Sequence, residues 1–294
     1  VYKRQILKGD LSTKRKLVLG LTVGLGLLTK TTTLVSLPLI AIALLWLHCT
    51  QGRRGTGERW RAILSDAIVI FGVALLLALP WLARNMQVYG LNDPLAWKRH
   101  DEIVVGQLTT RELWSRVGTK ALFLAFLRTT YQSFWAQFGW MGVLVDRRIY
   151  LALAWLSGIA GFGSLLSLTR MYKEREKLER WQRGAILLSV LWVCLTFGTY
   201  LWYNTKFVQH QGRYLFPALI PIGLFFALGL LESLSGRYDR VMVILFGISV
   251  ALALAIGLLT GNLSKISLLF ATVGLVFFLI RSYFTRLPAH AFTI

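Results

Sequence analysis

The chain has 294 residues, 55% of them hydrophobic and 16% charged, and its formal net charge is +20. Apolar runs of about 20 residues, long enough to cross a bilayer as a helix, recur along the chain and exclude a soluble globular domain. Lysine and arginine gather in the cytoplasmic loops of membrane proteins, so this charge does not indicate binding to nucleic acid. The two cysteines and four histidines show no disulfide or metal-ligand pattern, and we expect no metal and no cofactor.

Residues 17–49 form the first apolar run, and one lysine interrupts it. Lys30 is followed directly by Thr31, Thr32 and Thr33. A continuous helix of about 32 residues would be roughly 48 Å long, against a hydrocarbon core of about 30 Å, and would need an extreme tilt. We therefore predict two shorter helices that meet at the Lys-Thr turn and form a hairpin. Gly20, Gly24 and Gly26 are expected to allow close helix packing in its first arm.

The later apolar runs predict six further spans, so the fold class is all-α. We expect a polytopic helical membrane protein of about eight membrane segments, including the short hairpin, in a single transmembrane domain over residues 1–294. The long region 84–150 carries apolar residues at helical spacing, interrupted by basic ones. It predicts an outer loop region with amphipathic helices at the membrane interface. The predicted spans are 62–83, 151–168, 184–203, 215–234, 241–260 and 266–280.

Charge asymmetry orients these segments. With the hairpin, twenty Lys and Arg residues fall in the segments on one side, against Lys206, Arg213 and Lys265 in the short loops on the other. The richer side is expected to be cytoplasmic, and a single crossing at 17–49 gives a weaker asymmetry in either orientation. This topology places Lys30, the region 84–150 and the loop 204–214 outside the cytoplasm.

The first residues, VYKRQ, do not begin with methionine and resemble translated read-through of a sequencing adapter. We therefore expect the chain to be part of a longer protein that extends upstream.

Three stretches have features that helix packing in a membrane does not explain. They are LGLLTKTTTLVSLP (25–38), PWLARNMQVYGLNDPLAW (80–97) and HQGRYLFPALIPIGLFFALGL (210–230). Together they resemble membrane glycosyltransferases of the GT-C superfamily, which includes protein O-mannosyltransferases and the aminoarabinose transferases of lipid A. They also resemble bacterial membrane proteins of uncharacterised function in which a QGRY-like motif recurs. The resemblance is ordered along nearly the whole chain, but no single motif is specific.

The resemblance implies transfer of a sugar from a polyprenyl-phosphate donor to an acceptor (a glycan, lipid or protein) at the outer face of a bacterial plasma membrane. It implies that Lys30 contacts the carrier phosphate. A charged lysine inside a membrane segment is costly without a polar partner, and a lipid phosphate would supply one. The alternative is that Lys30 only extends its ammonium to the surface. The further candidates for binding the donor phosphate are Thr31, Arg84, Gln211, Arg213 and Tyr214.

Inverting glycosyl transfer needs a carboxylate to accept the acceptor's proton. In the resembled enzymes this acid lies in an outer loop near the N-terminus, and the chain shows no equivalent loop. The acids in the outer region are Asp93, Asp101, Glu102, Glu112 and Asp146. The sequence does not favour any of them as the catalytic base. Two other classes therefore stay open, namely a membrane scaffold or assembly subunit and a transporter of lipid or solute.

Overall fold

The computed structural model describes residues 11–50, 55–104, 107–139 and 141–284. These residues are almost entirely helical and form two compact units. The first unit takes its residues from Val1–Arg128 and Glu176–Pro221, and the second from Thr129–Arg175 and Ile222–Ile294. Parts of the basic segments counted for orientation, at 1–10, 51–54 and 285–294, lie outside the described residues.

Seven helical segments in the described part of the chain are long and apolar enough to cross a membrane. They confirm the predicted all-α polytopic fold, and each predicted span coincides with one of them. The eighth predicted segment is α2, which has 17 residues. The seven segments are Thr31–Thr50, Thr56–Tyr89, Arg147–Lys173, Arg180–Lys206, Gly212–Ser233, Asp239–Thr260 and Lys265–Phe284.

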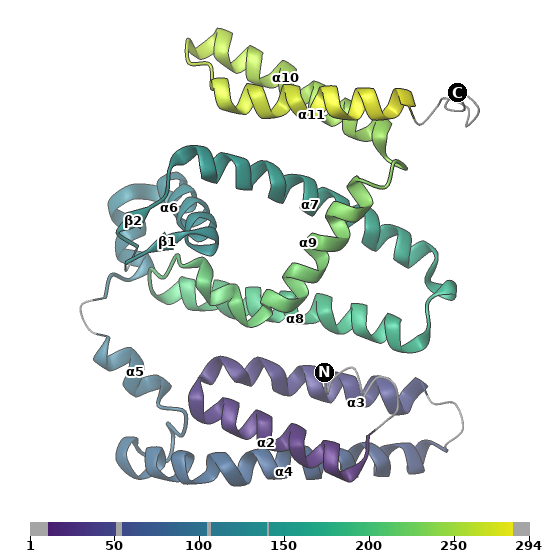
Figure 1. The fold of residues 1–294 in the computed structure, drawn as a ribbon. Coiled ribbons are helices and arrows are strands. Elements are labelled where there is room, and N and C mark those ends of the chain that lie inside the picture. Colours follow the sequence, from purple (N-terminus) through teal and green to yellow (C-terminus); the bar gives the residue numbers. More distant parts are fainter. Residues whose placement is uncertain (1–10, 51–54, 105–106, 140, 285–294) are drawn as a thin grey trace. The chain divides into compact units, whose positions relative to one another are not determined.

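The predicted hairpin is present in the first unit. Helix α2 (Thr13–Thr29) ends at Lys30, and the chain continues through the 3-10 turn η1 (Thr31–Val35) into α3 (Ser36–Thr50). Both helices pack on α4 (Thr56–Tyr89), and the three lie side by side in Figure 1. The arms are antiparallel, because residues near the start of α2 and near the end of α3 contact the same residue of α4.

Small residues allow α2 and α4 to approach closely, as the sequence indicated. A Cβ built at Gly20 would lie 2.6 Å from the Ile70 carbonyl oxygen, and one at Gly24 would lie 2.9 Å from Leu77. Gly26 instead faces Thr33 of η1, at 2.7 Å from its Cγ2. Two of the three glycines therefore serve helix packing, and the third allows the tight turn.

The core of the first unit surrounds α3. Its buried face carries Leu39, Ile40, Ala43, Leu44 and Leu47, which recur at helical spacing. Helix α8 (Arg180–Lys206) completes this core. The chain then passes through η3 (Gly212–Ala218) into α9 (Leu219–Ser233).

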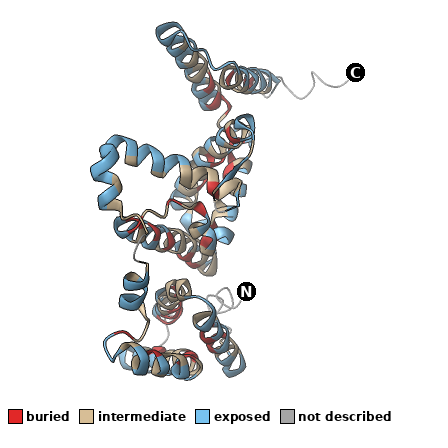
Figure 2. Cartoon of the chain, turned by 90° about the vertical axis from the view of Figure 1, so that its left-hand side faces the viewer, coloured by how far each residue is buried: buried red, intermediate tan, exposed pale blue. Residues whose placement is uncertain are grey.

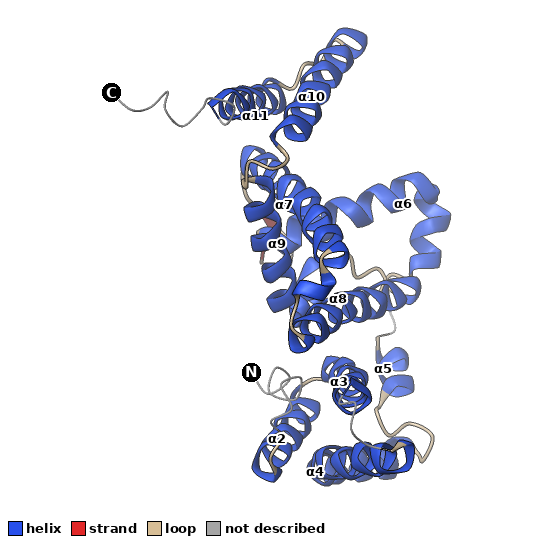
Figure 3. Ribbon diagram, turned by 90° about the vertical axis from the view of Figure 1, so that its right-hand side faces the viewer, coloured by secondary structure: helices blue, strands red, loops and turns tan. Residues whose placement is uncertain are grey.

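The region between α4 and α7 is helical, as predicted, with one small sheet in addition. It contains α5 (Trp97–Ile103) and α6 (Thr110–Trp135), followed by the strand pair β1 (Gln137–Phe138) and β2 (Val143–Leu144). Helix α6 bends at Gly118, whose φ of 77° is not helical, and the bend is visible in Figure 3. The position of these helices at a membrane interface stays a prediction.

In the second unit, α7 (Arg147–Lys173) and α9 meet through glycines. A Cβ at Gly163 would lie 2.0 Å from the Gly229 carbonyl oxygen, so the backbones touch there. Helices α10 (Asp239–Thr260) and α11 (Lys265–Phe284) pair with each other, and the Phe246 and Phe278 rings stack between them. Two ion pairs, Arg170 with Glu232 and Arg281 with Asp239, join helix ends in this unit. A short turn, η2 (Arg175–Lys177), precedes α8.

Large apolar side chains remain exposed along the outer faces of these helices. Figure 2 shows exposed residues over much of the helical surface, while buried residues are confined to faces that meet another helix. Leu258 and Leu259 at the end of α10, for example, are each 87% exposed. A soluble protein rarely exposes such continuous apolar surface, whereas a lipid environment accommodates it.

Candidate functional site

Lys30 lies at the tip of the hairpin, where the helix is interrupted. Its φ of −158° and ψ of 131° are extended, and its backbone N–H still donates to the Gly26 carbonyl. The Thr33 hydroxyl donates to the same carbonyl at 3.0 Å. Thr33 therefore holds the turn closed, while Thr31, the predicted site residue, follows Lys30 and is half-buried. The result is a fixed turn that presents the exposed Lys30 side chain at one end of the first unit.

The segment that follows α8 folds back over the same end. Asn204, which is buried, donates from Nδ2 to the Tyr200 carbonyl and accepts from the Gln209 backbone N–H. The Val208 N–H donates to the Leu108 carbonyl, which fastens this segment to the residues before α6. These contacts determine where η3 begins and therefore where Gln211, Arg213 and Tyr214 lie.

Two of the other predicted residues lie beside the Tyr214 ring, and a third shares an acceptor with its hydroxyl. Lys30 Nζ and the Arg213 guanidinium carbon each lie 5.9 Å from its centroid. Its hydroxyl donates to Gln209 Oε1 at 3.4 Å, and Gln211 Nε2 donates to the same oxygen at 2.9 Å. We call Lys30, Gln211, Arg213 and Tyr214 the Tyr214 cluster.

Aromatic side chains of α8 support this cluster. The Tyr200 and Tyr203 rings lie 6.4 and 6.1 Å from the Tyr214 ring. Behind them Phe126 of α6 stacks on Tyr200 and meets the His210 ring edge-on. Two cations therefore project from an apolar aromatic base, an arrangement suited to a ligand with an anionic group and an apolar or sugar face.

Lys30 has no ion pair with any described residue. In addition, Gln211 Oε1 is buried without a hydrogen-bond partner in the described part of the chain. A buried acceptor without a donor costs free energy, roughly 1–3 kcal/mol, which a ligand hydroxyl would recover. Among the described residues, the cluster thus offers one cation without an ion pair and one acceptor without a donor.

Arg84 makes other contacts, and the sequence misplaced the helix end beside it. Arg84 was expected where a span ends, but α4 continues to Tyr89 and is terminated by Gly90, whose φ is 96°. The Arg84 guanidinium donates to the Tyr89 hydroxyl at 3.1 Å and to Asn85 Oδ1 at 3.3 Å. Asn85 is buried and donates to the Pro94 carbonyl. No contact among the described residues joins Arg84 to Tyr214.

Asp93 has a structural use. Its carboxylate accepts from the backbone N–H groups of Trp97, Lys98 and Arg99 at the start of α5. Burial alone would raise the pKa of Asp93, but these three donors together outweigh it and lower the pKa below its ordinary value of 3.8. Asp93 therefore stabilises the start of α5 as a charged cap.

Three of the other outer acids also bind groups of the protein itself. Glu112 accepts from the backbone and hydroxyl of Thr109, which lower its pKa, and Asp146 caps α7 through the Arg148 N–H. Glu102 forms an exposed pair with Arg99.

Asp101 differs in its position. It pairs with Lys206 at the end of α8, 3.0 Å away, and with His100, whose ring lies 6.4 Å from Tyr203. Burial opposes the charged form, but the hydrogen bond from Lys206 and that from His100 lower the pKa of Asp101 overall. Through His100 and Tyr203, Asp101 is connected to the Tyr214 cluster.

His210 lies in the short segment between α8 and η3. It is buried, 7% exposed, against Phe126, and this burial lowers its pKa.

A second polar cluster at the opposite ends of the same helices was not predicted from the sequence. Asp66 of α4 receives Lys16 of α2 at 2.5 Å and His48 Nε2 of α3 at 2.9 Å, and all three side chains are largely buried. Arg180 of α8 donates to the carbonyl of Thr50, which follows His48 by two residues in the chain. The signal in the sequence was an aspartate inside the apolar run 62–83, because a buried charge there requires a partner.

Comparison with known proteins finds no relative. No protein-family model matches the chain, and neither the curated proteins nor the solved structures contain a match. Within the described residues, no group of three or more metal-ligating side chains occurs.

Proposed function

We propose that this chain is an integral-membrane glycosyltransferase, or the carrier-binding part of one, which takes a sugar from a polyprenyl-phosphate donor at the non-cytoplasmic face. The observation that carries the proposal is the convergence of Lys30 and Arg213 on the Tyr214 ring from segments far apart in the chain. The resemblance to GT-C enzymes along three stretches agrees with it.

The chemistry of the Tyr214 cluster suits a sugar phosphate. A lysine ammonium provides a point charge, and an arginine guanidinium provides planar paired donors, so together they can bind phosphate oxygens through charge-assisted hydrogen bonds. Gln211 Oε1, which has no hydrogen-bond partner among the described residues, would accept from a sugar hydroxyl. The proposal therefore assigns Lys30 and Arg213 to the phosphate and Gln211 to the sugar.

The position of the cluster suits a lipid carrier. The long apolar segments Thr31–Thr50 and Gly212–Ser233 both begin beside it. A polyprenyl chain could lie along their apolar faces in the hydrocarbon layer while its phosphate reaches Lys30. The charge asymmetry of the loops supports the proposal that this end lies on the non-cytoplasmic side. The proposal assigns no catalytic base.

The test uses the purified full chain in detergent and radiolabelled polyprenyl phosphate. We expect saturable binding that unlabelled polyprenyl phosphate displaces and that polyprenol, which lacks the phosphate, does not. Equal displacement by polyprenol would show that only the chain is recognised and would overturn the assignment of the cations.

A second measurement distinguishes an enzyme from a transporter and from a scaffold. With a polyprenyl-phosphate-linked sugar as donor, release or transfer of the sugar supports an enzyme or its active part. Movement of intact donor across proteoliposomes without release would indicate a transporter. Binding without either would indicate a scaffold or an incomplete enzyme.

A further inference from the structure

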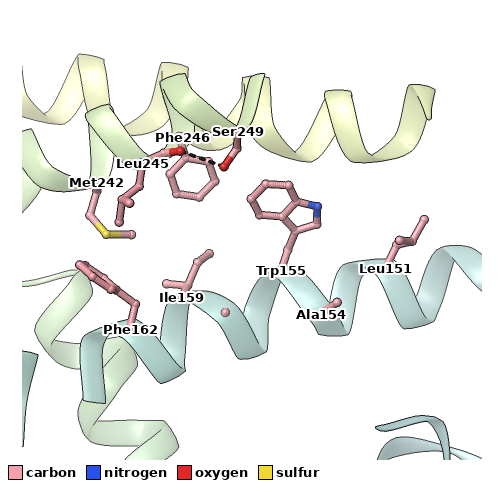
Figure 4. A pocket seen from close by; sticks show the side chains of 10 residues that line it. Leu151, Ala154, Trp155, Ile159, Phe162, Met242, Leu245, Phe246 and Ser249 are labelled. Carbon is pink, nitrogen blue, oxygen red and sulfur yellow. Dashed lines mark hydrogen bonds between the residues drawn. The ribbon is translucent and has the colours of Figure 1, made fainter. Parts of the chain in front are cut away.

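An apolar groove of about 260 Å³ lies between α7 and α10 in the second unit. Figure 4 shows the two helices with the side chains that face each other across it. On each helix the lining residues recur three or four positions apart, so one continuous face of each helix borders the groove. The lining residues are Leu151, Ala154, Trp155, Gly158, Ile159, Phe162, Met242, Leu245, Phe246 and Ser249.

Water does not suit this groove. A buried water typically needs two to four polar partners. Among the lining side chains only Ser249 and Trp155 carry a polar atom, and the Ser249 hydroxyl already donates to the Leu245 carbonyl at 2.8 Å. An apolar space of this kind stays dry and favours an apolar occupant.

Another helix does not fit either. The Trp155 and Phe246 rings stack across the groove with centroids 5.5 Å apart and an interplanar angle of 15°. The two rings close the gap between α7 and α10 at this point, so the open space lies beside the stack. A helix with its side chains is about 10–12 Å wide, which is too wide for a groove of about 260 Å³, so a thinner occupant fits it better.

The small residues of α7 deepen the groove. A Cβ built at Gly158 meets no atom within 4 Å, so the space beside its backbone is open. The Phe246 ring also stacks on Phe278 of α11, with centroids 5.5 Å apart, and both belong to one buried cluster. Both helices are long and apolar enough to cross a membrane, so the groove lies within segments that would sit at the depth of the hydrocarbon layer.

We propose that this groove binds one acyl chain of a membrane phospholipid. The site is in the second unit and uses none of the residues assigned to the carrier phosphate, so it stands or falls independently of the proposed function. Burial of apolar surface, worth about 25 cal/mol per Å², would hold the chain without any specific headgroup contact.

The test uses the full chain reconstituted in phosphatidylethanolamine vesicles that contain phosphatidylglycerol with a diazirine in its acyl chain. After irradiation, mass spectrometry maps the labelled residues. We expect enrichment on the facing segments of α7 and α10 over Ile68 and Leu76 of α4. These two side chains are each 70% exposed and report ordinary lipid contact.

Gly158→Leu should fill the groove and remove the enrichment. Gly223→Leu is the matched control, because a Cβ at Gly223 of α9 also meets no atom within 4 Å but Gly223 does not line the groove. Ser249→Leu fills the groove from α10, and it replaces Gly158→Leu in this test if Gly158→Leu does not fold. Labelling that is no higher than on α4, or enrichment that persists in the folded filled variants, would overturn the proposal. Cross-linking to a second copy of the chain at this face in place of lipid would also overturn it.

Discussion

Lys30 Nζ lies 5.9 Å from the centroid of the Tyr214 ring, and the Arg213 guanidinium lies at the same distance from that ring. Two positive charges would normally stay apart, since like charges repel. Here the electron-rich ring of one tyrosine attracts both. The proposed function requires this arrangement, because an anion beside the ring would meet both charges.

The Tyr214 ring should matter more than its hydroxyl. Tyr214→Phe keeps the ring and loses only a long hydrogen bond of 3.4 Å to Gln209. We expect it to bind polyprenyl phosphate about as well as the wild type. Tyr214→Leu removes the cation–π contacts and should weaken binding by about 1 kcal/mol, roughly fivefold. Equal affinities of the two variants in a binding titration would contradict this role of the ring.

The buried cluster at Asp66 should contribute strongly to stability. Asp66→Asn leaves Lys16 and His48 without their carboxylate, and breaking a buried ion pair typically costs about 3–5 kcal/mol. Asp101→Asn is the matched control, because the same change breaks a half-exposed pair with Lys206 that is worth less than about 1 kcal/mol. The free energy of unfolding in detergent is measured for both variants. Similar losses of stability in the two would contradict the importance of burial.

The contact between α7 and α9 predicts opposite effects for two glycines of one helix. Gly163→Ala would place a Cβ 2.0 Å from the Gly229 carbonyl oxygen and should destabilise the chain by about 1–3 kcal/mol. At Gly161 a Cβ meets nothing within 4 Å, so Gly161→Ala should stabilise α7 by about 0.5–1 kcal/mol. The midpoint of thermal unfolding should fall in the first variant and rise in the second, and a fall of equal size in both would refute the close contact.

Asp93 should make stability depend on acid pH. Its pKa in the folded chain is lowered, so its charged form adds stability that is fully present above the unfolded pKa of about 3.9. This contribution is lost as the pH falls through the lower folded value. Asp93→Asn should therefore reduce the stability difference between pH 6 and pH 3. An unchanged pH profile of the unfolding midpoint in Asp93→Asn would exclude the charged cap.

The sequence predicted the spans and the hairpin well, because both depend on local properties. The length of the apolar run 17–49 and the position of Lys30 within it were sufficient to predict the break. The end of α4 was missed, although Gly90 is a typical residue to follow a helix. In that case the polar residues from Arg84 onward were taken as the loop itself.

The sequence supplied candidate residues but not their arrangement. Lys30, Arg213 and Tyr214 were chosen one by one, and nothing in the sequence indicated that the two cations lie beside the same tyrosine ring. The same limit applies to Asp66, whose partners Lys16 and His48 come from other helices. Contacts between residues distant in sequence depend on helix packing, which hydropathy and charge patterns do not specify.

The most direct test of the account is the affinity of Lys30→Met for polyprenyl phosphate. Lysine and methionine are both unbranched, so the variant removes the charge with little change in shape. Hydrogen bonds to charged groups contribute about 1.5–3 kcal/mol, so we expect binding to weaken by about tenfold to a hundredfold, with unchanged thermal stability. Lys265→Met, at the exposed start of α11, is the matched control and should bind like the wild type. Wild-type affinity in Lys30→Met, or an equal loss in Lys265→Met, would contradict the assignment of Lys30 to the carrier phosphate.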